Sequence, residues 1–72
     1  MVSSPPAESR AALALRHSPI PSLRKLVIEV TDEVVVIRGS VKSYYLKQLA
    51  QETLMPHLAG RTLHNRVAVL PD

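Results

Sequence analysis

The sequence predicts an α+β fold, in which two helices cover one face of a three-stranded mixed sheet as a two-layer αββαβ sandwich. Three observations lead to this class. Apolar residues recur at helical spacing in two segments, alternate with a period of two in three others, and are punctuated by prolines and glycines. The 72 residues leave room for one aliphatic core, since two tyrosines are the only aromatic residues. We expect residues 1–7 to be a flexible tail and residues 8–72 to form the single domain.

The first helix is expected from Pro6 to about His17, where alanine and leucine recur three and four residues apart. Ser4 followed by Pro5 is typical of a helix start, because proline fits the first turn, where no intrahelical N–H bond is needed. The prolines that follow should end this helix, since a residue before proline is restricted to extended conformations.

An antiparallel hairpin of two strands is expected next. Residues Leu23–Thr31 alternate apolar and polar side chains, and the alternation resumes over Val34–Val41. The short polar break at Asp32 and Glu33 joins them as neighbours. Glutamate resists the positive φ of a type I′ turn, so the turn is expected to be wider or of another type.

The second helix is expected over "YYLKQLAQETL", with Ser43 as its N-cap and a stripe of leucines on one side. Pro56 should kink, tighten or end this helix before Gly60. Alternation over residues 61–70 predicts the third strand. A helix between the second and third strands makes them parallel, and we expect both to flank the first, which gives the strand order 2-1-3.

A set of residues recurs in fixed order and spacing through these elements. They are Ile28, Val30, Val35, Ile37, Gly39, Val41, Ser43, Ala50, Leu63, Asn65, Val67 and Val69. Over about residues 11–70, this set resembles the BON domain family, small bacterial αββαβ modules of osmotically induced periplasmic and nodulation-type proteins. The resemblance implies a non-enzymatic module that binds phospholipid surfaces or mediates protein contacts.

The sheet face that the helices leave open is the main candidate binding surface. If Val35 and Ile37 face the core, the alternate positions face outward. These are Val27, Glu29, Val34, Val36, Arg38, His64, Arg66 and Ala68. We expect the three valines to form an apolar patch framed by arginines and suited to a partner, although valines on an open face also reflect ordinary β-propensity. The exposed edge of the second strand is an alternative partner surface.

Tyr44 and Tyr45, close to Lys42 and Lys47, make the start of the second helix another candidate contact for lipid or protein. An amphipathic ring beside lysines has the composition of a membrane-interface anchor. The alternative is that one ring packs as a staple at the helix start.

The sequence predicts no enzyme, no cofactor and no metal site. Serine, histidine and acidic residues occur without a catalytic motif, and His17, His57 and His64 lie in different elements without ligand spacing. Gly39 has two interpretations. It can let backbone N–H groups face an anion, or it can leave room where the second helix or its entry loop crosses the sheet.

Charge and composition narrow the expected partners. Nine basic and six acidic residues give a net charge of +3, which mildly favours anionic partners. We therefore expect a membrane phospholipid or a protein partner, and we retain a homodimer. The alternative function is a nucleic-acid-associated domain, although the sheet offers no aromatic residue for base stacking. No small-molecule substrate is indicated. With no signal peptide or apolar span, we expect a cytoplasmic protein, or a periplasmic one if a signal is cleaved from a longer precursor.

Overall fold

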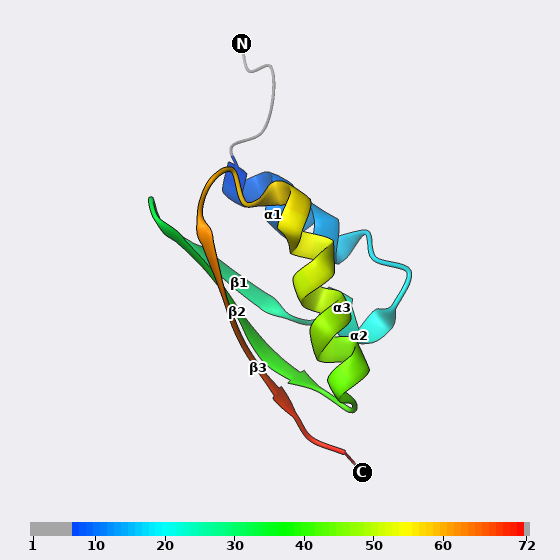
Figure 1. The fold of residues 1–72 in the computed structure, drawn as a ribbon. Coiled ribbons are helices and arrows are strands. Elements are labelled where there is room, and N and C mark those ends of the chain that lie inside the picture. The colour runs from blue at the N-terminus through cyan, green and yellow to red at the C-terminus, as the bar shows by residue number, and fades with distance from the viewer. Residues whose placement is uncertain (1–6, 72) are drawn as a thin grey trace.

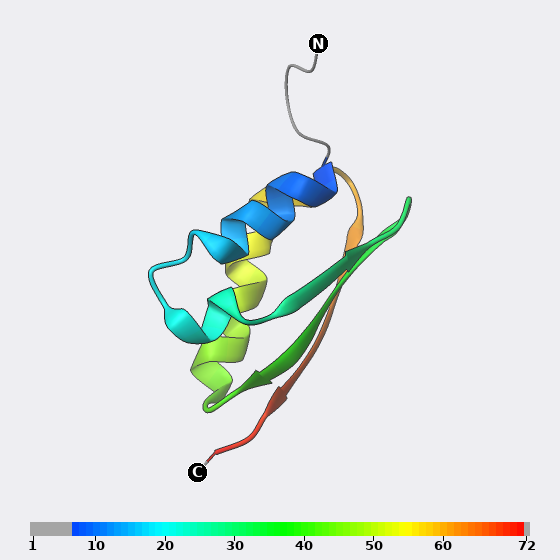
Figure 2. The same ribbon diagram turned by 180° about the vertical axis from the view of Figure 1, so that it is seen from behind.

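The computed structural model describes residues 7–71, with side chains described from Arg10 onward. The predicted Ser4 and Pro5 helix start and most of the predicted tail lie outside the described residues. The described chain is an α+β fold, as the sequence predicts, with helices and a three-stranded mixed sheet. Figures 1 and 2 show the helices on the same side of the sheet, which leaves the other side open.

Helix α1 spans Ala7–Arg16 and contributes Ala11 and Leu15 to the core. These two side chains are one helical turn apart, so they lie on the same side of the helix and are buried together. The chain leaves α1 through Ser18, whose buried hydroxyl accepts a hydrogen bond from the N–H of Ile20 at 3.1 Å. This bond satisfies a backbone donor in a segment that has no helix or strand partner.

Helix α2 is a single turn, Pro21–Arg24, at a point where the sequence predicts the start of a strand. That part of the prediction is wrong. Pro21 occupies the first helical turn, where its fixed φ suits a helix, and the extended Ile20 precedes it as the N-cap. The turn buries Leu23 completely. The first strand, β1, is therefore confined to Val27–Val30.

The strand order is β1-β2-β3, so the predicted order 2-1-3 is wrong. Strand β2, Val34–Val41, lies in the centre, antiparallel to β1 on one side and parallel to β3, Thr62–Val69, on the other. Strands β2 and β3 each have eight residues and pair along their whole length, whereas β1 pairs over four. Only β2 is long enough to pair with all of β3. The free edges therefore belong to β1 and β3, and the predicted exposed edge of the second strand does not exist.

The turn of the β1–β2 hairpin is closed largely by side chains. Thr31 donates its N–H to the carbonyl of Val34 at 2.8 Å, and the Thr31 hydroxyl accepts from the N–H of Val34 at 3.1 Å. The Thr31 carbonyl accepts instead from Nε of Arg61, at 2.6 Å. Neither Asp32 nor Glu33 has a positive φ, so the turn is not type I′.

Helix α3, Tyr44–Leu54, starts and ends as the sequence predicts. The hydroxyl of Ser43 caps it by accepting from the N–H of Leu46 at 3.2 Å. Pro56 cannot donate to the helix, and the chain tightens into the 3-10 turn η1, Met55–His57. Two residues with positive φ, Ala59 and Gly60, then redirect the chain into β3.

The inner face of the sheet carries the core, with one polar residue that joins β3 to α3. Val35 and Ile37 are buried, as their alternation predicts. Asn65 Nδ2 donates to the carbonyl of Lys47 at 3.0 Å and lies 3.4 Å from Oε1 of Gln51. Its Oδ1 accepts from the N–H of Val67 at 3.2 Å. Asn65 therefore fixes α3 against β3 while its own polar atoms are satisfied.

Gly39 is a clearance site, although the close neighbour is not the one the sequence predicts. A Cβ at this position would lie 2.7 Å from Cδ2 of Leu26, and φ is +136°, which side chains rarely tolerate. Leu26 lies just before β1, opposite Gly39 in the extended register, and α3 is not involved. Glycine is thus required by the chain that enters β1.

Candidate functional site

The outer sheet face is the side of the sheet that points away from the helices (Figures 1 and 2). The register places its side chains in rows across the strands. One row holds Val27, Arg38 and Arg66, the next Glu29, Val36 and His64, and flanking rows hold Val34 with Thr62 and Ser40 with Ala68. All eight residues that the sequence predicts for this face lie on it.

An ion pair divides this face. Arg38 Nη2 lies 3.3 Å from Oε1 of Glu29, and more than half of each side chain is exposed. In the register, these two residues are one diagonal of a square whose other corners are Val27 and Val36. The ion pair therefore lies between the valines, and the single apolar patch that the sequence predicts is split.

Apolar exposure on the outer face is concentrated at the β1 edge. Val27 is 57% exposed, whereas Val34 and Val36 on the central strand are half-buried. Arg66 stands beside Arg38 in the register, and within residues 7–71 it has no carboxylate at salt-bridge distance. The face thus offers one exposed valine, a central pair of valines and two neighbouring guanidinium groups that can donate to a partner.

The predicted contacts at the start of α3 form a separate surface. Tyr44 and Tyr45 are 64% and 68% exposed, so neither ring packs as a staple in the core. Lys42 lies beside them in the chain, whereas Lys47 is only half-exposed. We call Lys25, Lys42, Tyr44, Tyr45 and Leu70 the tyrosine surface. Leu70 is 61% exposed and lines a shallow cavity of about 290 Å³ together with Lys25 and Lys42.

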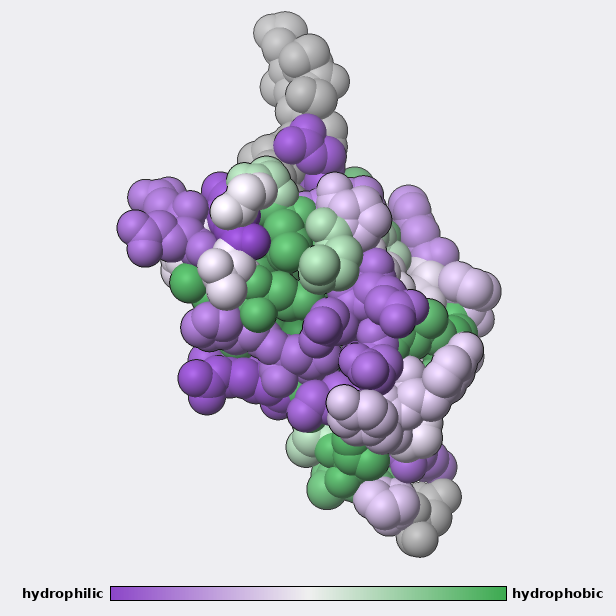
Figure 3. Space-filling model, in the orientation of Figure 1, coloured by the Kyte–Doolittle hydropathy of each residue, from purple (hydrophilic) through white to green (hydrophobic). Residues whose placement is uncertain are grey.

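The hydropathy of the molecular surface agrees with this division. In the view of Figure 3, a broad hydrophilic band crosses the middle of the molecule, and separate hydrophobic areas lie above and below it. The lower area adjoins the C-terminal end of the described chain, where Leu70 is exposed. Hydrophobic and cationic groups are therefore neighbours at this end.

The structure also places the three histidines. His17 and His57 line one cavity of about 260 Å³ beside Leu13, a proximity that their separation in sequence does not indicate. His64 lies on the outer sheet face. Across residues 7–71, no group of three His, Cys, Asp or Glu side chains gathers in the way a metal ion requires.

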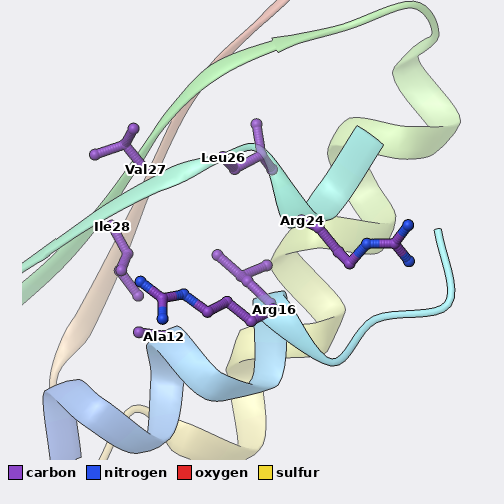
Figure 4. Close-up of a pocket in the computed structure, with 7 residues that line it drawn as sticks. Ala12, Arg16, Arg24, Leu26, Val27 and Ile28 are labelled. Carbon is purple, nitrogen blue, oxygen red and sulfur yellow. The ribbon is translucent and has the colours of Figure 1, made fainter. Parts of the chain in front are cut away.

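A cleft of about 380 Å³ lies beside β1, and sequence reasoning did not find it (Figure 4). Its lining comes from α1, from α2 and from the chain that leads into β1. The residues are Ala12, Leu15, Arg16, Arg24, Leu26, Val27 and Ile28. The available signal was Pro21 as a helix start, because only the turn α2 brings Arg24 to the cleft of which Arg16 forms another wall.

Comparison of the chain with protein families, with curated proteins and with solved structures finds no match. Among the helices of residues 7–71, none has both the length and the apolar content needed to cross a membrane.

Proposed function

We propose that this chain is a non-enzymatic, BON-like binding module that contacts a protein partner through its outer sheet face. The observation that carries the proposal is that no helix of the described chain covers this face, although it holds valines and paired arginines (Figure 2). An open sheet face with apolar side chains is stabilised further when a partner removes it from water.

The charge arrangement supports a protein partner with acidic groups at its contact. Arg38 and Arg66 are neighbours in the register, and only Arg38 has an ion-pair partner within the described residues. A carboxylate from the partner would relieve the repulsion between the two guanidinium groups and form charge-assisted hydrogen bonds. The same arginines would also steer the approach of an acidic surface.

The test is the variant Val36→Glu, which places a charge at the centre of the outer face. We expect the fold to persist, because the side chain does not enter the core, and partner binding to be lost. Val36→Thr is the matched control, since it keeps the branched shape without a charge and should weaken binding less. Heteronuclear NMR shifts report the fold, and affinity capture followed by calorimetry reports binding. Unchanged binding of Val36→Glu to the captured partners would rule out this face.

A second candidate function, contact with an anionic phospholipid surface, is favoured by the tyrosine surface. Exposed tyrosines beside lysines suit the boundary between acyl chains and anionic headgroups. The test is co-sedimentation with vesicles of phosphatidylcholine, with and without phosphatidylglycerol. We expect binding only to the anionic vesicles, and we expect Tyr44→Ser combined with Lys42→Glu to abolish it while Arg66→Glu leaves most of it. Equal loss in Arg66→Glu would assign the lipid contact to the outer face instead.

A further inference from the structure

The free edge of β1 and the cleft beside it form a site that is separate from the outer sheet face. We propose that this site binds an extended acidic segment of a partner protein, which adds to the sheet as a strand next to β1. The proposal does not depend on partner binding by the outer face. It rests on the unpaired backbone of β1, on the arginines of the cleft, and on the position of Glu29.

The backbone of β1 presents free hydrogen-bonding groups at regular intervals. The N–H of Thr31 donates to Val34, so Thr31 directs its N–H toward β2. In an antiparallel pair this direction alternates, so Glu29 and Val27 also point toward β2, whereas Ile28 and Val30 point their N–H and C=O groups to the free edge. Within the described residues no strand pairs with that edge. An added strand would satisfy these groups.

The cleft supplies the charge complementarity that defines the occupant. Figure 4 shows the Arg16 side chain along the cleft with its guanidinium near Ile28, and the Arg24 side chain extending toward the opposite end. Arg24 donates Nη1 to the carbonyl of Ser18 at 2.9 Å, which holds its guanidinium in place and leaves other N–H groups for a ligand. None of the residues that line the cleft is acidic. Arg16 has no ion pair within residues 7–71.

The two sides of the added strand are distinguished by what lies on the two sides of β1. Toward the helices, alternate side chains would enter the cleft and meet Arg16 and Arg24, which suits carboxylates. Away from the helices, the other side chains would lie beside the exposed Val27 and beside Glu29, which suits apolar residues and disfavours acidic ones. The segment that fits therefore alternates acidic and apolar residues.

The experiment uses the blocked peptide acetyl-VEVEVEV-amide as the probe, with acetyl-VKVKVKV-amide as its charge-reversed control. We expect the acidic peptide to shift NMR signals of β1 and of Arg16, and the basic peptide to shift neither. Hydrogen exchange gives the decisive reading, because the amides of Ile28 and Val30 should become protected only with peptide bound. Equal binding of the two peptides, or protection of neither amide, would overturn the proposal.

The variants separate this site from its surroundings. Arg16→Glu should weaken the acidic peptide by about tenfold or more, since it converts an attraction into a repulsion. Arg10→Glu makes the same charge change on the same helix but outside the cleft, and it should alter the affinity by less than about twofold. If Arg16→Glu is poorly folded, Arg16→Gln replaces it and should weaken binding less. Equal effects at positions 10 and 16 would contradict the site.

Two further outcomes are informative. Val36→Glu should bind the acidic peptide as the unmodified chain does, so loss of outer-face binding and loss of edge binding can be told apart. Light scattering of the free chain tests whether a second copy already occupies the edge. Protection of Ile28 and Val30 that depends on protein concentration, without peptide, would show such a dimer and would overturn the peptide as the occupant.

Discussion

The inner and outer faces of the sheet carry the same kinds of residue and have opposite roles. Val35 and Ile37 on the inner face are buried, whereas Val34 and Val36, their neighbours on the same strand, remain half-exposed. The difference does not come from residue type, since valines occupy both faces. It comes from the helices, which cover only one face. Along β2, stability therefore depends mainly on one set of alternate residues, and binding is proposed for the other.

The largest expected effect comes from shortening one side chain on each face. Ile37→Ala should lower the free energy of unfolding by about 3 to 4 kcal/mol, because it leaves a cavity in a core that cannot fully collapse. Val36→Ala should lower it by less than about 1 kcal/mol. For a domain of this size the first loss is a large part of the total stability. Urea unfolding followed by circular dichroism measures both, and similar losses would show that the faces are not distinct.

A smaller effect is expected at Gly39, where the inner face lacks a side chain. Gly39→Ala should cost about 2 kcal/mol, from the unfavourable φ together with the contact of the new Cβ with Leu26. Leu26→Ala removes the contact and leaves the φ. In a double-mutant cycle, the cost of Gly39→Ala should therefore fall by about 1 kcal/mol in the Leu26→Ala background. A cost that does not change would attribute the whole effect to backbone conformation.

The sequence predicted the two faces correctly and the strand order wrongly, for related physical reasons. Alternation in a strand specifies which side chains are buried together, and that requirement is met equally by the orders 2-1-3 and 1-2-3. The order follows from strand length, which depends on where β1 begins. Pro21 was interpreted as a break rather than as the first turn of α2, so β1 was predicted too long. Pairing of β1 with all of β3 then seemed feasible.

The candidate surfaces were predictable only as far as alternation reaches. The outer-face residues were identified because their positions follow from those of Val35 and Ile37. The division of that face by Arg38 and Glu29 depends on the cross-strand register, which the sequence did not give. The cleft with Arg16 and Arg24 depends on how α1 and α2 pack beside β1, and no local pattern encodes such a long-range arrangement.

The smallest expected effect concerns the ion pair on the outer face. Both Arg38 and Glu29 are more than half exposed, so water and salt screen their attraction. Glu29→Gln and Arg38→Gln should each change the free energy of unfolding by less than about 0.5 kcal/mol, and a double-mutant cycle should give a coupling that disappears in high salt. A coupling that persists there would show a desolvated pair. Because the pair lies between Val27 and Val36, we expect the double variant to bind apolar partners of the outer face more tightly while its stability hardly changes. The ion pair would then limit the adhesiveness of this face without stabilising the fold.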